Sequence, residues 1–271
     1  MIDLNDIDIS RIISLLKEMK GIDFSDYAQS SLKRRIIRFF EINGISDVTE
    51  FTRRMKIENE FPDFFINEIT VNVTEMFRDP AFWCVLRDKV IPELNKRPLI
   101  NIWHAACSSG EEVFSMAILL KELEILDKCK ITATDLNLNI LRIAQNGVYP
   151  LKSQELNGKN YTQFGGKGKL SDYYSIQEKN VVFNQELIRN TKFKFHDLTK
   201  DGPFGIFDLI ICRNVFIYFN FNLQERVVAI FNRSLGKNSY LAIGSKESIS
   251  WNRSAMNFKD VNFELKIFQK N

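Results

Sequence analysis

The chain has 271 residues, which is room for one large domain or for a small domain joined to an α/β domain of ordinary size. Hydrophobic residues make up 45% of it and charged residues 26%, a balance that excludes a disordered chain. The formal net charge of +3 is too small to indicate a nucleic-acid-binding protein by bulk electrostatics.

The cysteines and the hydropathy of the chain indicate the cellular compartment in which we expect the protein. Cys84, Cys107, Cys129 and Cys212 are scattered and form no C-x-x-C pair, so we expect neither a disulfide framework nor a metal site. The amino terminus is acidic and lacks the basic start and apolar run of a secretory signal. No stretch approaches the roughly 20 apolar residues of a membrane span. We therefore expect a reduced, soluble, cytoplasmic protein with no membrane insertion.

Residues 1–70 show helical periodicity and no strand pattern. Ile9, Ile12, Ile13 and Leu16 recur at the three- and four-residue spacing of an amphipathic helix. Further helices are predicted at 30–40, 48–57 and 61–70, the last with Pro62 at its start. We expect a small all-helical domain over 1–70, followed by a linker over 71–97.

The helix predicted at 30–40 has a basic side. Arg34 and Arg38 lie opposite its apolar face, and Lys33 and Arg35 flank them. A face of this kind is most often simply solvated, and the alternative is a docking surface for an acidic partner.

Strands and helices alternate after residue 97. Short apolar strands are predicted at 99–105, 130–134, 192–196, 207–212 and 240–244, with helices at 111–126, 138–146 and 222–235. This alternation indicates an α/β fold with a doubly wound, mostly parallel sheet over 98–271. Residues 263–269 are predicted to add one more strand, antiparallel at the end of the sheet. Residues 148–191 interrupt the pattern, as a small inserted subdomain or as a flexible excursion.

The turn after the first strand favours one class of cofactor. Small residues from 105 to 110 let the backbone approach a ligand closely, but the fingerprint G-x-G-x-x-G is absent and only Gly110 is present. Glu111 and Glu112 at the helix start would repel a pyrophosphate and tolerate a cationic sulfonium. This favours S-adenosylmethionine over a nicotinamide dinucleotide.

Three later turns offer further polar groups. Asp135 ends the second strand, where a carboxylate can accept both hydroxyls of a ribose; its alternative role is a helix N-cap. Asp197 follows the next strand and is by itself ordinary turn chemistry. Arg213 directly follows a buried strand, which would be costly unless it faced a polar cleft. Tyr218 either points into that cleft or packs as a core aromatic.

Four motifs occur in order: N-x-T-x-x-F-R at 72–78, A-A-C-S-S-G-E-E at 105–112, T-D at 134–135 and C-R-N-V-x-I-Y-F at 212–219. Together they resemble the CheR family of chemotaxis receptor methyltransferases, which esterify glutamate side chains. The resemblance spans nearly the whole chain. It implies a Rossmann-like class I methyltransferase fold, S-adenosylmethionine as cofactor and S-adenosylhomocysteine as product.

The resemblance also implies roles for individual residues. The methionine end of the cofactor and the reaction site would be contacted by Asn72, Thr74 and Arg78. Glu112, rather than Glu111, would bind the amino-acid portion directly or through a pair with Arg78. The ribose would be held by Asp135, and the adenine would be framed by Asp197 and Leu198. The cofactor and the incoming glutamate would be bordered by Arg213, Asn214 and Tyr218. We expect Arg78 and Tyr218 to be catalytic. Docking on the acidic helical bundle of a chemoreceptor would use Lys33, Arg34, Arg35 and Arg38.

Two features depart from the family pattern. His104 stands where a small residue is usual, which leaves a packing role or a polar contact open. The segment 148–191 corresponds to a β-subdomain that in some members captures a receptor tail through a glycine-rich loop. Residues 177–180 contain no glycine here, so we expect recognition without a tail. Separately, we expect the enzyme to be a monomer.

Two other functions share this fold or pocket. A nucleic-acid or small-molecule methyltransferase is disfavoured by the modest charge and by the lack of an N/D-P-P-Y motif. A signalling adaptor that binds the cofactor without turnover is disfavoured by the intact motifs. The sequence offers no candidate general base, which is compatible with methylation of a receptor glutamate, because a glutamate acceptor is already ionised at neutral pH.

Overall fold

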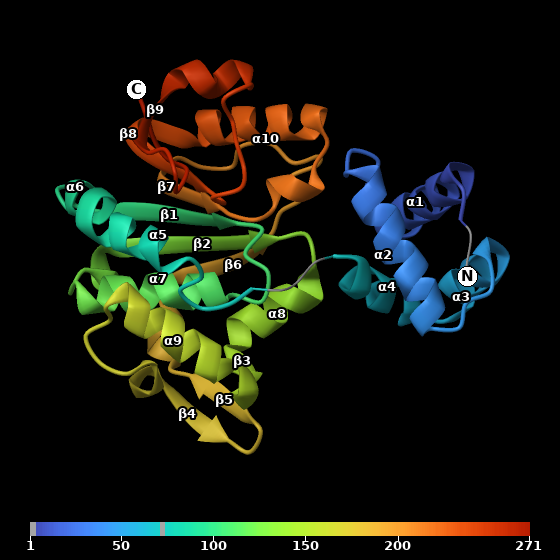
Figure 1. Ribbon diagram of the computed structural model, residues 1–271, viewed down its shortest axis with the longest axis horizontal. Helices are drawn as coiled ribbons and strands as arrows, with labels where there is room; N and C mark the ends of the chain where they lie inside the picture. The colour runs from blue at the N-terminus through green and yellow to red at the C-terminus, as the bar shows by residue number, and fades with distance from the viewer. Residues whose placement is uncertain (1–3, 71–73) are drawn as a thin grey trace.

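The computed structural model describes residues 4–70 and 74–271. A group of helices at the amino terminus stands beside an α/β domain, and a small second sheet lies beneath the large one (Figure 1). The described residues include no helix long and apolar enough to cross a membrane.

The helical part contains the four predicted helices: α1 (Asp6–Lys20), α2 (Gln29–Ile42), α3 (Val48–Ile57) and α4 (Phe61–Ile69). A capping box of Asn5 and Asp8 begins α1, and Gly21 ends it in the left-handed conformation, with φ 69°. The apolar faces meet in a core where the ring of Phe65 contacts those of Phe39 and Phe51 edge to face.

The predicted linker contains a helical run that belongs to the core. It consists of α5 (Pro80–Val85), one π-helical turn η1 (Leu86–Val90) and α6 (Ile91–Leu94). Phe82 and Trp83 are fully buried, and α5 packs against α9 of the insertion. This anchors the cofactor-motif segment that precedes α5.

The large sheet has the strand order β6-β2-β1-β7-β8-β10-β9. Its strands are β1 (Ile100–Ala105), β2 (Cys129–Asp135), β6 (Thr191–Phe195), β7 (Phe207–Cys212), β8 (Leu235–Ile243), β9 (Phe258–Asn262) and β10 (Ile267–Lys270). The first five are parallel, as predicted, and β10 is antiparallel to β8. The predicted end strand over 263–269 is confirmed only from Ile267 onward: residues 263–266 form a turn between β9 and β10, and the edge strand of the sheet is β9, which was not predicted. Polar residues at 259, 260 and 262 mask the strand signal of β9.

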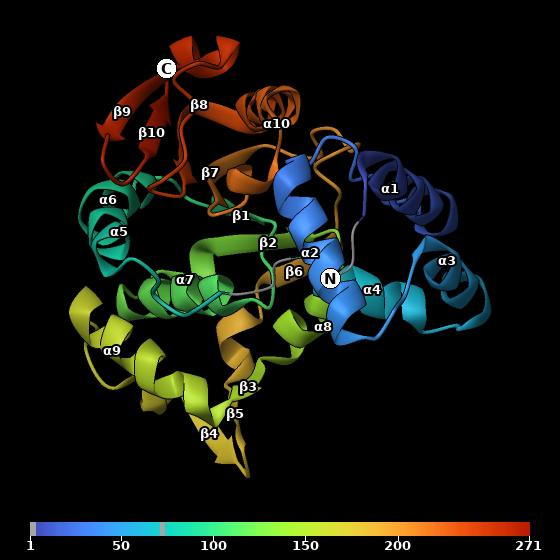
Figure 2. The same ribbon diagram turned by 45° about the vertical axis from the view of Figure 1, so that its right-hand side comes forward.

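Helices cover both faces of this sheet. Residues of α7 (Glu111–Glu122) and α8 (Leu138–Asn146) share one buried cluster with the face that carries Ile102 and Ile211. On the other face, α10 (Phe221–Ser234) and the amino-terminal helices share a cluster with Trp103 and Ile210. Figure 2 shows α2 and α10 approaching the same end of the sheet.

The inserted segment is folded. It contains β3 (Val148–Pro150), α9 (Gln154–Phe164), β4 (Tyr174–Gln177) and β5 (Asn180–Phe183), and the three strands form an antiparallel sheet in the order β3-β5-β4. Short 3-10 turns η3 (Leu151–Ser153), η4 (Leu170–Tyr173) and η5 (Gln185–Ile188) connect them. Of the two interpretations of this segment, the small subdomain describes it.

The direction of the strand order changes at β1. The chain passes from β1 to β2 and β6 on one side, and β7 and β8 lie on the other. Ligands of open α/β sheets bind where the order reverses, beyond the carboxyl ends of the strands. The turns after β1, β2 and β7 meet at this point, and the candidate site is built there.

Candidate functional site

The turn after β1 has an unusual backbone. Ala106 and Ser108 have φ of 55° and 52°, and Gly110 has φ 92°. A Cβ at Gly110 would lie 2.7 Å from the Cβ of Ala144, so only glycine fits without displacing α8. The Cys107 N–H donates to the Thr134 carbonyl at 2.8 Å, which ties the turn to β2. Positive φ at non-glycine residues is concentrated at functional sites, and it is held here by surrounding contacts.

A cleft opens at this turn, between the sheet and the helical part. It brings together most of the predicted site residues, and its lining residues are Tyr27, Arg35, Thr70, Thr74, Arg78, Ala106, Cys107, Ser108, Glu112, Asp135, Leu136, Arg213, Asn214, Val215, Ile217, Tyr218 and Phe219. Of the predicted residues, Asp197 and Leu198 do not line it. Asn72 lies outside the described residues.

Glu112 is held from two sides. His104 Nδ1 lies 3.1 Å from Glu112 Oε1, and Arg213 Nη1 lies 3.2 Å from Oε2. Burial raises the pKa of Glu112, but the hydrogen bond from His104 and the charge of Arg213 outweigh it, so the pKa is lowered. This answers the question left open about His104: its fully buried ring makes a polar contact with the glutamate.

Arg213, not Arg78, is the partner of Glu112. Arg213 also pairs with Asp79 Oδ2 at 2.5 Å and lies over the ring of Phe82, 4.0 Å from the centroid. The expected pair between Arg78 and Glu112 is therefore wrong. The Arg78 guanidinium makes no ion pair or hydrogen bond with any residue that the structure describes, although its carbonyl accepts from Arg213 at 3.4 Å.

Asp135 faces the cleft with acceptor capacity left over. Its Oδ2 accepts from the Ser108 N–H at 2.9 Å, and its Oδ1 accepts from the Asn137 N–H at 3.0 Å. Burial raises the pKa of Asp135, and these N–H groups oppose the shift. The side chain of Asn137 caps α8, so the N-cap role that was the alternative for Asp135 belongs to Asn137. Each carboxylate oxygen retains a lone pair for a ligand hydroxyl.

Glu111 differs from its neighbour Glu112. Its carboxyl accepts from the Ser109 hydroxyl at 2.6 Å, and burial raises its pKa to about 7. It does not line the cleft. The contrast agrees with the preference for Glu112 as the ligand-facing glutamate.

A glutamate that the sequence analysis did not single out supports the turn after β7. Glu247 is buried, and its Oε2 accepts from the N–H groups of Asn214 at 3.1 Å and Gly244 at 2.5 Å. These bonds hold Asn214 at φ 62°. The available signal was a charged residue four positions after the apolar strand β8, where the chain returns to the same end of the sheet.

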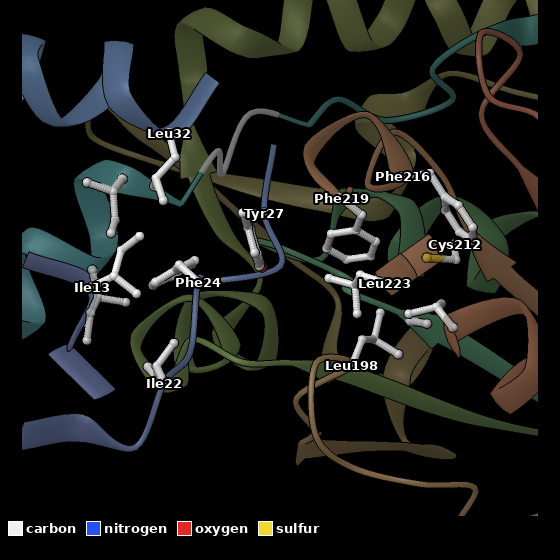
Figure 3. Close-up of a cluster of buried hydrophobic side chains, with 14 of the residues drawn as sticks. Ile13, Ile22, Phe24, Tyr27, Leu32, Leu198, Cys212, Phe216, Phe219 and Leu223 are labelled. Atoms are coloured by element: carbon white, nitrogen blue, oxygen red, sulfur yellow. The ribbon is translucent and has the colours of Figure 1, made fainter. Parts of the chain in front are cut away.

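The turn after β6 is closed on itself. Asp197 is fully buried, and its Oδ1 accepts from the N–H and the hydroxyl of Thr199. Its own N–H donates to Asp201 at 2.8 Å. Leu198 packs in the hydrophobic cluster of Figure 3. Turn chemistry thus accounts for these contacts of Asp197, and the adenine role of the pair remains a prediction.

The basic side of α2 is divided by the structure. Arg34 and Arg38 are exposed, and Lys33 pairs with Asp6 at 3.1 Å. Arg35 turns into the cleft, where its guanidinium lies 5.1 Å from the ring centroid of Tyr218. Its Nη1 donates to the Ile69 carbonyl, and its Nη2 is buried with no hydrogen bond to a described residue. The prediction that Arg35 belongs to the exposed docking face is therefore wrong.

Comparison with known proteins identifies the family. The model of the CheR methyltransferase all-alpha domain matches residues 7–70, and that of the CheR methyltransferase SAM binding domain matches residues 72–265. The chain belongs to the CheR methyltransferase family. Cher3 of Pseudomonas putida is 35% identical over 98% of this chain and 97% of its own. Chemotaxis protein methyltransferases of Listeria monocytogenes and Borreliella burgdorferi are 34% and 30% identical, over 87% and 91% of this chain and 87% and 90% of theirs.

S-adenosylmethionine, the cofactor of CheR methyltransferases, suits the charges of the cleft. S-adenosylmethionine carries a ribose diol, a sulfonium, and an amino-acid portion with an ammonium and a carboxylate. The cleft offers acceptor oxygens on Asp135 and Glu112, and a guanidinium on Arg78 that is free to bind a carboxylate. The donor and acceptor groups present therefore fit the cofactor.

Proposed function

We propose that this methyltransferase esterifies glutamate side chains on the cytoplasmic helical bundle of chemoreceptors. The names of the relatives from Listeria and Borreliella support the chemotaxis role. The observation that carries the acceptor class is the Arg35 guanidinium beside Tyr218, with a buried Nη2 that lacks a partner among the described residues. A buried cation with an unused donor is suited to an anionic acceptor.

The cofactor would be bound by groups from four turns. Asp135 would accept the two ribose hydroxyls. Glu112, fixed by His104 and Arg213, would accept from the ammonium of the amino-acid portion, and Arg78 would bind its carboxylate. Thr74 and Asn214 border the same cleft. Asn72, Asp197 and Leu198 keep the roles that the family resemblance implies.

The acceptor would enter between Arg35 and Tyr218. The bound cofactor supplies an electrophilic methyl group on sulfur. An ionised glutamate needs no general base, because its pKa of about 4.3 leaves it charged at neutral pH. Catalysis then rests on orientation: Arg35 and the Tyr218 hydroxyl would hold the carboxylate in line, with Arg78 near the reacting atoms. The π-face of Tyr218 shares the positive charge of Arg35, which limits how strongly that charge quenches the nucleophile.

The receptor would dock along α2. Arg38 follows Arg35 by three residues and Arg34 by four, so the two exposed cations share one face of α2, and Arg38 lies next to the cleft residue Arg35. One glutamate would enter the cleft while its neighbours contact Arg34 and Arg38.

The subdomain supports recognition without a receptor tail. The turn between β4 and β5 consists of Glu178 and Lys179, and Glu178 adopts φ 52° in place of a glycine. A short turn of charged residues differs from the glycine-rich loop of tail-binding members.

Labelled S-adenosylmethionine and a receptor cytoplasmic fragment test this proposal. Label that mild base releases from the fragment as methanol is the expected result. Label on nucleic acid would favour the same-fold alternative, and tight binding of the cofactor without transfer would favour an adaptor. Either of the latter outcomes contradicts the proposal.

A further inference from the structure

The connection between α1 and α2 crosses the carboxyl end of the large sheet. We call residues 21–28 the strap. It is fastened to the methyltransferase domain at several points: Lys200 Nζ donates to the Gly21 carbonyl at 2.9 Å, and the Asn220 N–H donates to the Asp26 carbonyl at 2.9 Å. Arg226 pairs with Asp26 at 2.9 Å. The strap is thus part of the α/β domain's surface, although it belongs to the helical domain.

Tyr27 is the strap residue that reaches the cleft. It forms an isolated bridge with Phe219, and the next N–H along the chain, on Ala28, donates to the Tyr218 carbonyl at 2.8 Å. Its ring lies edge-on to Phe24, with centroids 4.6 Å apart, and to Phe219, with centroids 5.4 Å apart. Figure 3 shows Tyr27 between Phe24 and Phe219. The ring is therefore held rigidly, and it lines the cleft.

The turn after β6 lies beside the strap: Lys200 binds the Gly21 carbonyl, and Arg226 binds both Asp26 and the Thr199 carbonyl. Burial raises the pKa of the Tyr27 phenol, and the negative charges of Asp197 and Asp135 raise it further. The guanidinium of Arg35 opposes this rise. Asp197 and Asp135 follow β6 and β2, whereas Glu112 and Arg213 form a separate pair of charges in the cleft. The phenol is neutral at physiological pH, and its hydroxyl makes no hydrogen bond with any described residue, so it is free to donate to a ligand.

We infer that Tyr27 is a cofactor-binding residue. Through it, the helical domain supplies an aromatic wall where the adenosine part of the cofactor binds. Leu136 and Val215 line the same cleft as Tyr27 and Asp135, so apolar groups adjoin the carboxylate that we propose binds the ribose. Contact with an aromatic ring stabilises a bound base. The helical domain thereby contributes to binding of the cofactor, independently of the acceptor proposed above.

Two substitutions on the strap separate this role from a structural one. Tyr27→Leu and Phe24→Leu both remove a buried ring, but Phe24 does not line the cleft. Calorimetric titration with S-adenosylhomocysteine and with 5′-methylthioadenosine, which lacks the amino-acid part, gives the readout. We expect Tyr27→Leu to weaken both ligands by a similar factor of roughly tenfold. We expect Phe24→Leu to change both by less than about threefold, and Tyr27→Phe to retain most of the affinity because the ring remains.

Three results would overturn the inference: unchanged affinity in Tyr27→Leu, equal losses in the two leucine variants, or a loss confined to S-adenosylhomocysteine. Should Tyr27→Leu not fold, hydrogen exchange on the unaltered protein decides. Both ligands should slow exchange of the strap amides at 21–28. Unchanged exchange there, with protection of the turn after β1, would equally refute the role.

Discussion

His104 and Glu112 are joined side chain to side chain, Nδ1 to Oε1 at 3.1 Å, from the end of β1 to the first turn of α7. A carboxylate can only accept, so Nδ1 carries the hydrogen and the imidazole acts as a donor. Arg213 holds the second oxygen of the same glutamate. The orientation of Glu112 is thereby fixed before any ligand binds, and the first prediction tests this.

We expect His104→Ala to weaken binding of S-adenosylhomocysteine by roughly tenfold, since one hydrogen bond to a charged group is lost and Glu112 gains rotational freedom. Calorimetric titration checks this. His196→Ala is the matched control, because His196 is also buried but its Nε2 faces the Gly202 carbonyl outside the cleft. Equal affinity of the His104 variant and the unaltered protein would remove His104 from the site.

Glu111 makes folding stability depend on pH. Its pKa in the fold is about 7, above the ordinary 4.5, so the native state binds the proton more tightly than the unfolded chain. The stability that the protonated carboxyl contributes is present below pH 4.5 and is lost as the pH rises through 7. Glu111→Gln keeps a neutral side chain at every pH.

Urea unfolding at several pH values tests this. The free energy of unfolding of Glu111→Gln, minus that of the unaltered protein, should increase from about pH 5 to about pH 8. Glu155→Gln is the control: Glu155 is exposed and its pKa is lowered by Lys159, so its difference should not rise over this range. A difference for Glu111→Gln that stays flat with pH would contradict the burial of the charge.

Position 110 requires glycine because its φ is positive and because α8 leaves no space for a Cβ. A Cβ there would lie 2.7 Å from Ala144 Cβ and 2.9 Å from Ala144 Cα, at φ 92°. We expect Gly110→Ala to reduce the free energy of unfolding by about 2–4 kcal/mol. Gly158→Ala, in α9 with no atom within 4 Å of the added Cβ, should raise it by about 0.5–1 kcal/mol. Denaturant titration of both variants measures the contrast, and equal effects would contradict the crowding at Gly110.

Arg34 and Arg38 provide the docking prediction. The double variant Arg34→Glu with Arg38→Glu should slow methylation of a receptor fragment by roughly tenfold or more, because attraction to acidic residues becomes repulsion. The affinity for S-adenosylhomocysteine should stay within about twofold, since neither residue lines the cleft. Arg53→Glu, the same change at an exposed residue of α3, is the control. Unchanged methylation in the double variant would contradict docking on α2.

The sequence was sufficient where topology alone decides position. Asp135 and Arg213 were expected at the site because the carboxyl ends of parallel strands meet at one edge of a sheet, whereas the choice of Glu112 over Glu111 came from the family resemblance. The sequence was not sufficient to predict side-chain positions where the two domains meet. The periodicity of α2 predicts which side is apolar, but not that Arg35 turns toward Tyr218. The strap shows no regular pattern, so nothing in the sequence marked Tyr27.

The sequence also did not show which charged side chains pair with one another. Arg78 and Arg213 were both expected near the cofactor, and only the positions of Asp79 and Phe82 decide that Arg213 is the one buried against Glu112. Glu247 was missed for a similar reason, because a carboxylate that binds main-chain N–H groups has no sequence motif of its own.

We propose that this cleft transfers a methyl group to a glutamate carboxylate. Tandem mass spectrometry of a chemoreceptor cytoplasmic fragment, incubated with the enzyme and S-adenosylmethionine, detects this transfer. We expect the added mass of one methylene on glutamate, lost in mild base and absent when that glutamate is replaced by glutamine or when the enzyme carries Asp135→Ala. A base-stable methyl on another side chain, or methylated glutamate formed undiminished by the Asp135 variant, would contradict it.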